Sequence, residues 1–219
     1  MKLMPNKLTP MTALEVLRAF RAAFSGLQGR TPSNSTLAIL TAQSALETGR
    51  WKSMHCYNMG NIRPPKGWTG SYCQFRCNEK INGQWVWFDP PSPGSNFLAF
   101  ETAAEGAAYY MNKLAARWPE AWAAALAGDA AGFVHGLKQR GYFTADETPY
   151  RVGVKKLCAE FFAYMERGLV APEEANIPAH EPPPEALQSV AGAILAAHPL
   201  DSGASSAGMN VSGWERQES

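Results

Sequence analysis

The sequence predicts an α+β fold that is mainly helical and carries a small β-hairpin lobe. Residues 10–48 and 102–167 place apolar side chains at helical spacing, whereas residues 51–100 are rich in Gly, Pro, Asn, Trp and Tyr. Within this middle region Asn82-Gly83 separates two β-compatible stretches, which is the strongest short-range signal of a hairpin. The hairpin is therefore expected between two helical halves.

The length and charge of the chain limit what it can be. Its 219 residues, of which 46% are hydrophobic, suffice for one well-buried domain plus a tail. The formal net charge is +1 and no run of Lys and Arg forms a polybasic arm, so nucleic acid is not an expected partner. No apolar stretch approaches the length of a membrane-spanning helix, and the N-terminus MKLMPNKLTP lacks the apolar segment of a secretory signal.

The first helix is expected to begin near Thr9-Pro10, with Thr12 and Glu15 at capping-box spacing, and to end at Gly26 and Gly29. Its core-facing residues are Leu14, Leu17, Phe20 and Phe24. Strands are expected near 72–80 and 84–88, with a loop at 89–95.

Four further helices are expected, at about 102–116, 119–127, 129–140 and 149–167, the last one opened by Pro149. The last helix should bury Val152, Leu157, Phe161, Phe162 and Met165. Beyond residue 170 the chain becomes rich in proline and then in small polar residues. We therefore expect a domain at 1–170 and a linker with a disordered tail at 171–219.

One acidic residue stands out in the second expected helix, at about 33–48. Glu47 is the only ionisable residue between positions 31 and 48, and it lies in the last turn. The negative end of the helix dipole and partial burial both disfavour its charged form, so it is expected to hold a proton near neutral pH. Such a carboxyl suits general-acid catalysis. A glutamate on a solvated helix face is the alternative.

The hairpin region offers a second carboxylate. Hydrolysis of a glycosidic bond uses an acid and, in most enzymes, a second carboxylate across the cleft. Glu79, near the hairpin tip, is the candidate, with Asp89 and Glu101 as competitors. A charged, exposed hairpin tip without function is the alternative.

Aromatic side chains are frequent in the same region, and they pack well against the apolar faces of sugar rings. Asn and Arg residues are interleaved among them, which suits carbohydrate, although ordinary hairpin packing is expected to use some of the rings. The candidates for substrate binding are Tyr57, Asn58, Asn61, Arg63, Trp68 and Trp85.

The four cysteines match no standard zinc spacing. A metal site that joins His55 and Cys56 to Cys73 and Cys77 is a lesser alternative. A Cys73–Cys77 disulfide needs a turn, because an extended strand separates residues i and i+4 by about 13 Å. A Cys56–Cys73 bridge is the more plausible disulfide, and free thiols, including that of Cys158, are the alternative.

Two motifs, AQSALETGRW at 42–51 and YNMGNIR at 57–63, resemble those of the glucosaminidases of glycoside hydrolase family 73, within the lysozyme-like superfamily. Flagellar peptidoglycan hydrolases and autolysins belong to this family. Its motifs read approximately A-Q-x-A-L-E-S-G-W-G-x-S and Y-N-x-F-G-I-K. The chain departs from the first at Gly49-Arg50-Trp51, where the family has Gly-Trp-Gly, and from the second at Asn61.

Later positions resemble the family in the same order. Glu79 precedes Asn82-Gly83, as an acidic residue does in the family's hairpin, and FLAF follows at 97–100. A family-like G-Y-A-T-D-x-x-Y motif is echoed by Gly141, Tyr142, Thr144, Asp146 and Tyr150. The resemblance thus extends over about residues 10–168.

The resemblance implies a lysozyme-like fold in which Glu47 is the general acid, Glu79 is the second carboxylate and Tyr142 lines the cleft. The implied substrate is the peptidoglycan glycan strand, cleaved at the β-1,4 linkage between N-acetylglucosamine and N-acetylmuramic acid, without metal or organic cofactor. A lytic transglycosylase that forms anhydromuramic ends and a non-catalytic wall-binding module are the alternatives.

An enzyme of this kind acts in the periplasm or the extracellular cell wall. Because no signal peptide is seen, delivery by a phage or by a dedicated secretion machine is expected. The tail at 171–219 is a candidate tether to a carrier or secretion partner, or an end without a function.

Overall fold

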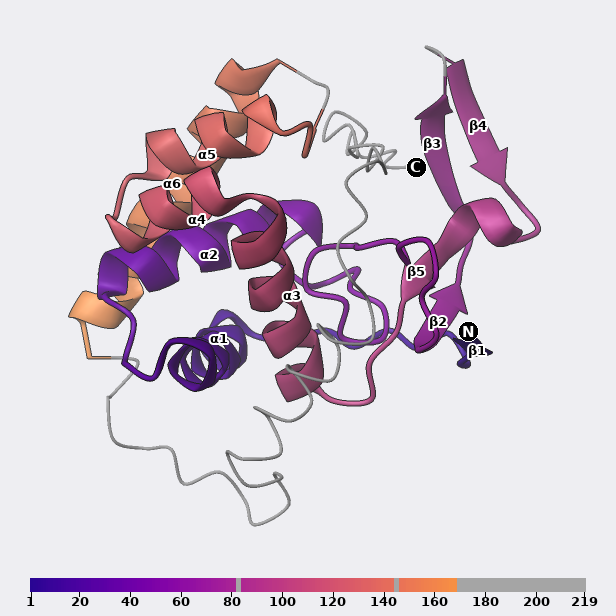
Figure 1. The fold of residues 1–219 in the computed structure, drawn as a ribbon, viewed down its shortest axis with the longest axis horizontal. Helices are drawn as coiled ribbons and strands as arrows, with labels where there is room; N and C mark the ends of the chain where they lie inside the picture. The colour runs from indigo at the N-terminus through magenta and orange to yellow at the C-terminus, as the bar shows by residue number, and fades with distance from the viewer. Residues whose placement is uncertain (82–83, 144–145, 169–219) are drawn as a thin grey trace, which may run out of the picture.

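The computed structural model describes residues 1–81, 84–143 and 146–168. These residues form six α-helices gathered into one body, with two small sheets beside it (Figure 1). The hairpin turn Asn82-Gly83 and the expected linker and tail at 171–219 lie outside the described residues. Within those residues, no helix has both the length and the apolar character needed to cross a membrane.

The centre of the helical body is α2 (Asn34–Glu47), in which eleven of the fourteen residues are buried. It packs against α6 (Glu147–Glu166), α1 (Ala13–Gln28) and α4 (Pro119–Leu126). A helix that is apolar on nearly all sides is stable only when other elements surround it. Figure 1 shows its C-terminal end directed toward the sheets.

The remaining helices cover this centre. α3 (Ala103–Arg117) packs against α1, and α5 (Ala130–Gln139) packs against α4 and α6. Thr102 and Asp129 cap α3 and α5 through side chains that accept hydrogen bonds from backbone amides, as their spacing predicts.

The start of α1 differs from the expectation near Thr9-Pro10. Thr12 and Glu15 form a complete capping box, and the helix begins at Ala13. Thr9 instead bonds the Met54 carbonyl through its backbone amide, which holds it outside the helix. Gly29 ends the helix in the left-handed region, where glycine carries no steric penalty.

α6 begins two residues before Pro149, which corrects the expected start. The carboxylate of Asp146 accepts a bond from the amide of Thr148, and Pro149 sits in the first turn, where its missing N–H is not needed. Phe161 and Met165 are buried as expected, and Leu157 is half-buried. Val152 (62% exposed) and Phe162 (37% exposed) are not core residues, because α6 contacts α2 and α5 through one face only.

The expected strand at 72–80 is two strands in different sheets. β2 (Ser71–Gln74) lies between β1 (Lys2–Leu3) and β5 (Asn96–Leu98), neither of which was expected. β3 (Cys77–Ile81) pairs in antiparallel register with β4 (Gln84–Phe88) as the predicted hairpin. The chain turns at Phe75, whose ring stacks on those of Phe97 (4.5 Å) and His55 (3.9 Å) instead of continuing the strand.

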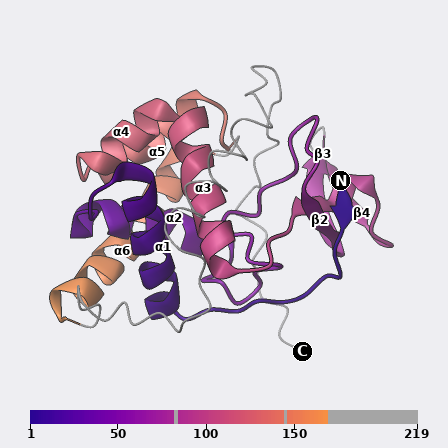
Figure 2. The ribbon, with the colours of Figure 1, turned by 60° about the horizontal axis from the view of Figure 1, so that its bottom comes forward.

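The hairpin stands apart from the helical body (Figures 1 and 2). The N-terminal segment runs between the two parts: the amide of Met4 bonds the carbonyl of Tyr72, and the carbonyl of Lys7 accepts from the amide of Cys56. Residues 1–9 therefore tie the loop after α2 to the three-stranded sheet.

Candidate active site

Glu47 is the last residue of α2 and is 9% exposed. Two neighbouring side chains hold this end of the helix. The hydroxyl of Thr48 donates to the Ser44 carbonyl at 2.7 Å, and the indole N–H of Trp51 donates to the Ser44 hydroxyl at 3.0 Å. Trp51 is 1% exposed and packs on Phe161, so the tryptophan of the altered Gly49-Arg50-Trp51 sequence anchors the helix end in the core.

The carboxyl of Glu47 has two neutral donors on the same oxygen. Its Oε1 accepts hydrogen bonds from the Tyr150 hydroxyl at 2.8 Å and from the Gln43 amide at 3.3 Å. Burial raises the pKa of Glu47 to about 7, and the bonds from Tyr150 and Gln43 oppose this rise. Oε2 accepts from neither donor, so it is the oxygen left to carry a proton at neutral pH.

Gln43 joins three tyrosines to this carboxyl. Its amide nitrogen lies 2.6 Å from the Tyr142 hydroxyl and 3.3 Å from that of Tyr150, and its amide oxygen accepts from Tyr110. Burial is the largest cause that raises the pKa of all three tyrosines. Their hydroxyl groups therefore stay neutral near neutral pH; those of Tyr110 and Tyr150 donate hydrogen bonds, and that of Tyr142 accepts one from Gln43.

The loop after Glu47 has an unusual backbone. Five residues other than glycine adopt positive φ angles between 47° and 61°, namely Arg50, Trp51, Cys56, Tyr57 and Asn61. Such conformations cost free energy and persist only where surrounding contacts enforce them. One of these contacts is the amide of Asn61, which donates to the backbone carbonyl of Glu47 at 2.5 Å. The strained loop is thus attached directly to the residue that carries the buried carboxyl.

Two of the expected substrate-binding residues have mainly framework contacts. The Asn58 amide donates to the carbonyls of Ile62 and Leu98, and its oxygen accepts from the amide of Ile62, so Asn58 fastens the loop to β5. Tyr57 is half-buried. It packs against the helical core and against a second apolar cluster formed by Trp68, Leu98, Phe100 and Tyr109.

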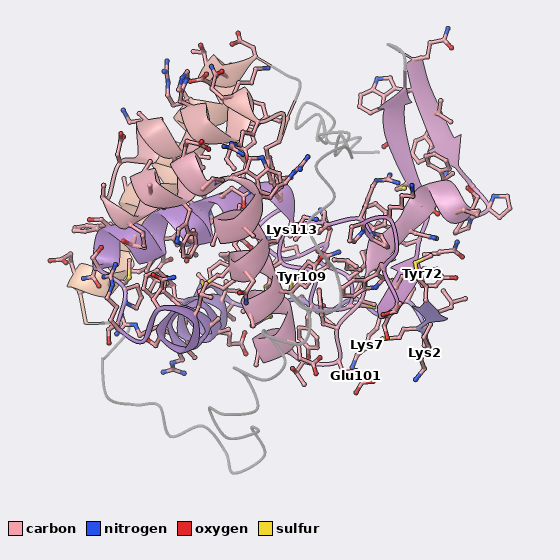
Figure 3. The ribbon with its side chains drawn as sticks, viewed as in Figure 1. Lys2, Lys7, Tyr72, Glu101, Tyr109 and Lys113 are labelled. Atoms are coloured by element: carbon pink, nitrogen blue, oxygen red, sulfur yellow. The ribbon has the colours of Figure 1, made fainter. Side chains whose placement is uncertain are left out.

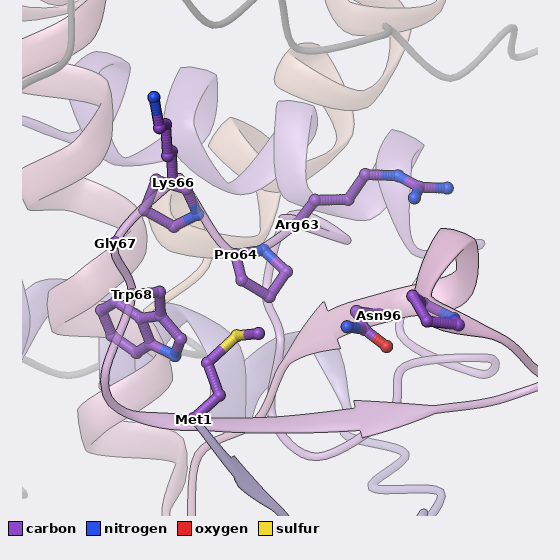
Figure 4. Close-up of a pocket in the computed structure, with 9 residues that line it drawn as sticks. Met1, Arg63, Pro64, Lys66, Gly67, Trp68 and Asn96 are labelled. Atoms are coloured by element: carbon purple, nitrogen blue, oxygen red, sulfur yellow. The ribbon is translucent and has the colours of Figure 1, made fainter.

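Arg63 and Trp68 line a pocket of about 330 Å³ together with Met1, Lys66 and a set of prolines (Figure 4). The guanidinium of Arg63 donates to the Gly94 carbonyl and lies over the Phe97 ring. The indole of Trp68 is 8% exposed and donates to the Ser71 carbonyl. Lys66 and Arg63 extend in different directions in Figure 4, so they do not form one anion site.

The hairpin carries Trp85 and Glu79. Trp85 is 47% exposed on β4. The backbone of Glu79 lies in β3 opposite Val86, and its side chain is outside the described part of the structure. Of its competitors, Asp89 forms an ion pair with Arg76, and Glu101 is exposed before α3. Binding by these hairpin residues stays a prediction.

The structure thus brings Tyr142 to Glu47 through Gln43, and it adds Gln43 and Tyr150 as site residues that the sequence reading did not select. Gln43 lies four residues before Glu47 on one helix, so the two side chains face the same way. It is also the only amide-bearing side chain in α2 after its first residue. This spacing was a usable signal for Gln43. Tyr150 ends the family-like motif that begins at Gly141, but its contact with Glu47, 103 residues away, was not predicted.

The residues with known placement offer no metal centre: no group of three or more His, Cys, Asp and Glu side chains among them is arranged to hold an ion.

The contribution of the Tyr150 hydrogen bond to the pKa of Glu47 can be tested by mutation. We expect Tyr150→Phe to raise that pKa by about one unit, because a bond to a charged acceptor contributes about 1.5–3 kcal/mol and 1.36 kcal/mol corresponds to one unit. Tyr142→Phe is the matched control, since Tyr142 bonds Gln43 and not Glu47. Carboxyl ¹³C NMR titration measures both variants. Equal pKa values in the two would contradict this role of Tyr150.

The similarity of this chain to known proteins is found in solved structures and not in sequence comparisons. A scan of protein-family models gives no match to this chain, and neither does a search of curated proteins. The crystal structure of a peptidoglycan hydrolase mutant from Sphingomonas sp. A1 matches at 22% identity over 70% of this chain and 99% of that chain, with a TM-score of 0.50. A C-terminally truncated glycoside hydrolase domain from Salmonella typhimurium FlgJ matches at 17% identity over 69% and 98%, with a TM-score of 0.45. The Sphingomonas match confirms the predicted fold class, a mainly helical, lysozyme-like α+β domain.

Proposed function

We propose that the protein is a glycosidase that cleaves peptidoglycan glycan strands at the β-1,4 linkage between N-acetylglucosamine and N-acetylmuramic acid. The observation that carries the proposal is the buried Glu47 carboxyl, whose pKa of about 7 keeps it protonated in a large fraction of molecules at neutral pH. The fold shared with a peptidoglycan hydrolase and the four ordered motifs support the same assignment.

In this proposal Glu47 delivers its proton from Oε2 to the glycosidic oxygen as the bond to the sugar breaks. The carboxylate that results gains charge at the moment when Tyr150 and Gln43 already donate to Oε1. Donors that are positioned before the reaction stabilise developing charge without further reorganisation. Tyr142 is a positioning residue, because its hydroxyl contacts Gln43 rather than the carboxyl.

Glu79 is the second carboxylate of the proposed reaction, and it stabilises the oxocarbenium-like sugar or activates water. We expect Glu79→Gln to lower the cleavage rate about 100-fold or more, the usual contribution of a positioned acid–base group. Glu101→Gln is the matched control and should keep the full rate. Turbidity clearing of purified cell wall measures both. A Glu79→Gln variant as active as the control would remove Glu79 from the mechanism.

A lytic transglycosylase is the second candidate, since such an enzyme uses one glutamate as acid and then as base. One observation favours it: Glu47, with its neutral donors Tyr150 and Gln43, supplies the single buried carboxyl that such an enzyme needs. A pKa of about 7 suits both the acid and the base role equally well.

The products of digestion separate these candidates. Purified peptidoglycan is digested, reduced with borohydride and analysed by mass spectrometry. The proposed specificity gives strands that end in reduced N-acetylglucosamine. Reduced muramic ends would instead indicate the other glycosidic bond, and anhydromuramic ends would establish the transglycosylase. If no cell-wall preparation releases soluble fragments, the protein is better explained as a non-catalytic wall-binding module.

We propose that the enzyme acts in the periplasm or the extracellular wall. In this proposal the segment at 171–219 links the enzyme to its carrier.

A further inference from the structure

Two cysteines from distant parts of the chain lie side by side at the three-stranded sheet. Cys56 is in the loop after α2 and is 2% exposed, and Cys73 is fully buried in β2. Both belong to a small apolar cluster with Phe97 and Ala99, separate from the helical core. Each thiol has the largest influence on the pKa of the other, which is consistent with their place in the same cluster.

The backbone holds each cysteine firmly on its own side. Cys56 donates its amide to the Lys7 carbonyl at 2.9 Å, and its carbonyl accepts from the Phe100 amide at 3.0 Å. Cys73 is paired with Phe97 in the antiparallel ladder of β2 and β5. Figure 3 labels Lys7 and Tyr72, which flank this part of the molecule. Because both side chains lie in this one cluster, side-chain rotation can bring the sulfur atoms toward the bonded distance of about 2.05 Å.

The two thiols differ in chemical character. The bond from Cys73, with a smaller contribution from the backbone and charge of Lys7, lowers the pKa of Cys56. The interaction with Cys56 and burial raise the pKa of Cys73. Cys56 is therefore the thiol that ionises more readily, and the thiolate is the attacking species in thiol–disulfide exchange.

We propose that Cys56 and Cys73 form a reversible disulfide that fastens the loop after Glu47 to strand β2. The oxidant is a small-molecule disulfide such as oxidised glutathione. The Cys56 thiolate attacks one of its sulfur atoms, forms a mixed disulfide and expels one thiolate. Cys73 then loses its proton, attacks the Cys56 sulfur and expels the second thiolate. Two electrons and two protons leave the protein, and two small thiols form.

The bond acts on the part of the chain that carries the proposed acid. It closes the loop 57–72, which includes Asn61, and it fixes Cys56, whose own φ angle is +47°. Closing a loop of this length removes freedom from the unfolded chain, and the melting temperature is expected to rise by roughly 5–10 °C on oxidation. The inference is independent of the proposed enzymatic activity.

The test uses the full chain equilibrated in buffers with graded ratios of oxidised to reduced glutathione. Free thiols are then alkylated, and the peptides are mapped by mass spectrometry without reduction. We expect one bridge, between Cys56 and Cys73, and two alkylated cysteines, Cys77 and Cys158. Four alkylated cysteines at every ratio would overturn the proposal, and so would a bridge that contains Cys77, which packs against the same cluster.

Matched variants test the stabilisation. Wild type and Cys158→Ser should both melt at a higher temperature after oxidation, whereas Cys56→Ser should not respond. Cys158 lies in α6, away from the pair, and burial raises its pKa to about 12, so it is a poor nucleophile. If Cys56→Ser fails to fold, the peptide map of the wild-type protein still decides the outcome. A bridge that forms without any rise in melting temperature would refute the fastening role.

Discussion

Replacement of Glu47 with glutamine is expected to lower cleavage of purified peptidoglycan about 1,000-fold. The amide keeps the size of the side chain and can still accept the bond from Tyr150, but it has no proton to deliver to the leaving oxygen. Release of soluble fragments from labelled cell wall measures the loss. Full activity in this variant would exclude Glu47 as the acid.

The same variant should be more stable than the wild type above neutral pH. The folded protein holds the Glu47 proton up to about pH 7, whereas the unfolded chain releases it near 4.5. The folded state therefore binds more protons between these values, and its stability falls as the pH rises through this range. The loss is complete above pH 7 and amounts to about 3 kcal/mol at 1.36 kcal/mol per pKa unit.

Glutamine removes this loss, so we expect the melting temperature of Glu47→Gln to exceed that of the wild type by about 5 °C at pH 8 and by little at pH 4.5. Glu160→Gln is the matched control. Its exposed ion pair with Arg50 lowers the pKa of Glu160, so its removal should cost a little stability at pH 8 and leave activity unchanged. A Glu47→Gln variant that gains no stability at pH 8 would contradict the burial of this carboxyl.

Replacement of Gly106 with alanine should destabilise the protein by about 2 kcal/mol. A Cβ atom at Gly106 would lie 2.0 Å from the backbone carbonyl oxygen of Tyr57, and a backbone atom cannot move aside as a flexible side chain does. Forced overpacking of this kind typically costs about 1–3 kcal/mol or more, which exceeds the gain of about 1 kcal/mol in helix propensity. Denaturant unfolding measures the change.

Gly26 supplies the opposite case in a helix of the same protein. A Cβ atom there meets nothing within 4 Å, so Gly26→Ala should raise the free energy of unfolding by about 0.5–1 kcal/mol. The two variants make the same chemical change and should move stability in opposite directions. Equal effects would mean that α3 does not approach Tyr57 closely. Because Tyr57 belongs to the loop that leads from Glu47 to the sheets, Gly106→Ala should also reduce any activity that depends on Glu47.

Much of the fold is encoded in short stretches of the chain. The capping boxes at Thr12 and Thr102 begin α1 and α3, since a cap and its partner lie only three residues apart. The hairpin follows from Asn82-Gly83 and its two flanking strands. The position of Glu47 in the last turn of an otherwise uncharged helix is equally local, and together with the family-like motifs it makes this residue the candidate acid.

The surroundings of Glu47 depend on contacts between distant residues. Its pKa is set by burial under several helices, and its hydroxyl donor, Tyr150, comes from α6. The break of the expected long strand at Phe75 and the exposure of Val152 likewise follow from what packs against each side chain. Periodicity indicates that a helix or strand has an apolar face, but only the assembled structure decides which residues that face touches. For this reason the sequence could select Glu47 as a candidate acid and Cys56–Cys73 as a candidate pair, whereas the hydrogen bonds that tune the Glu47 carboxyl arise only from tertiary packing.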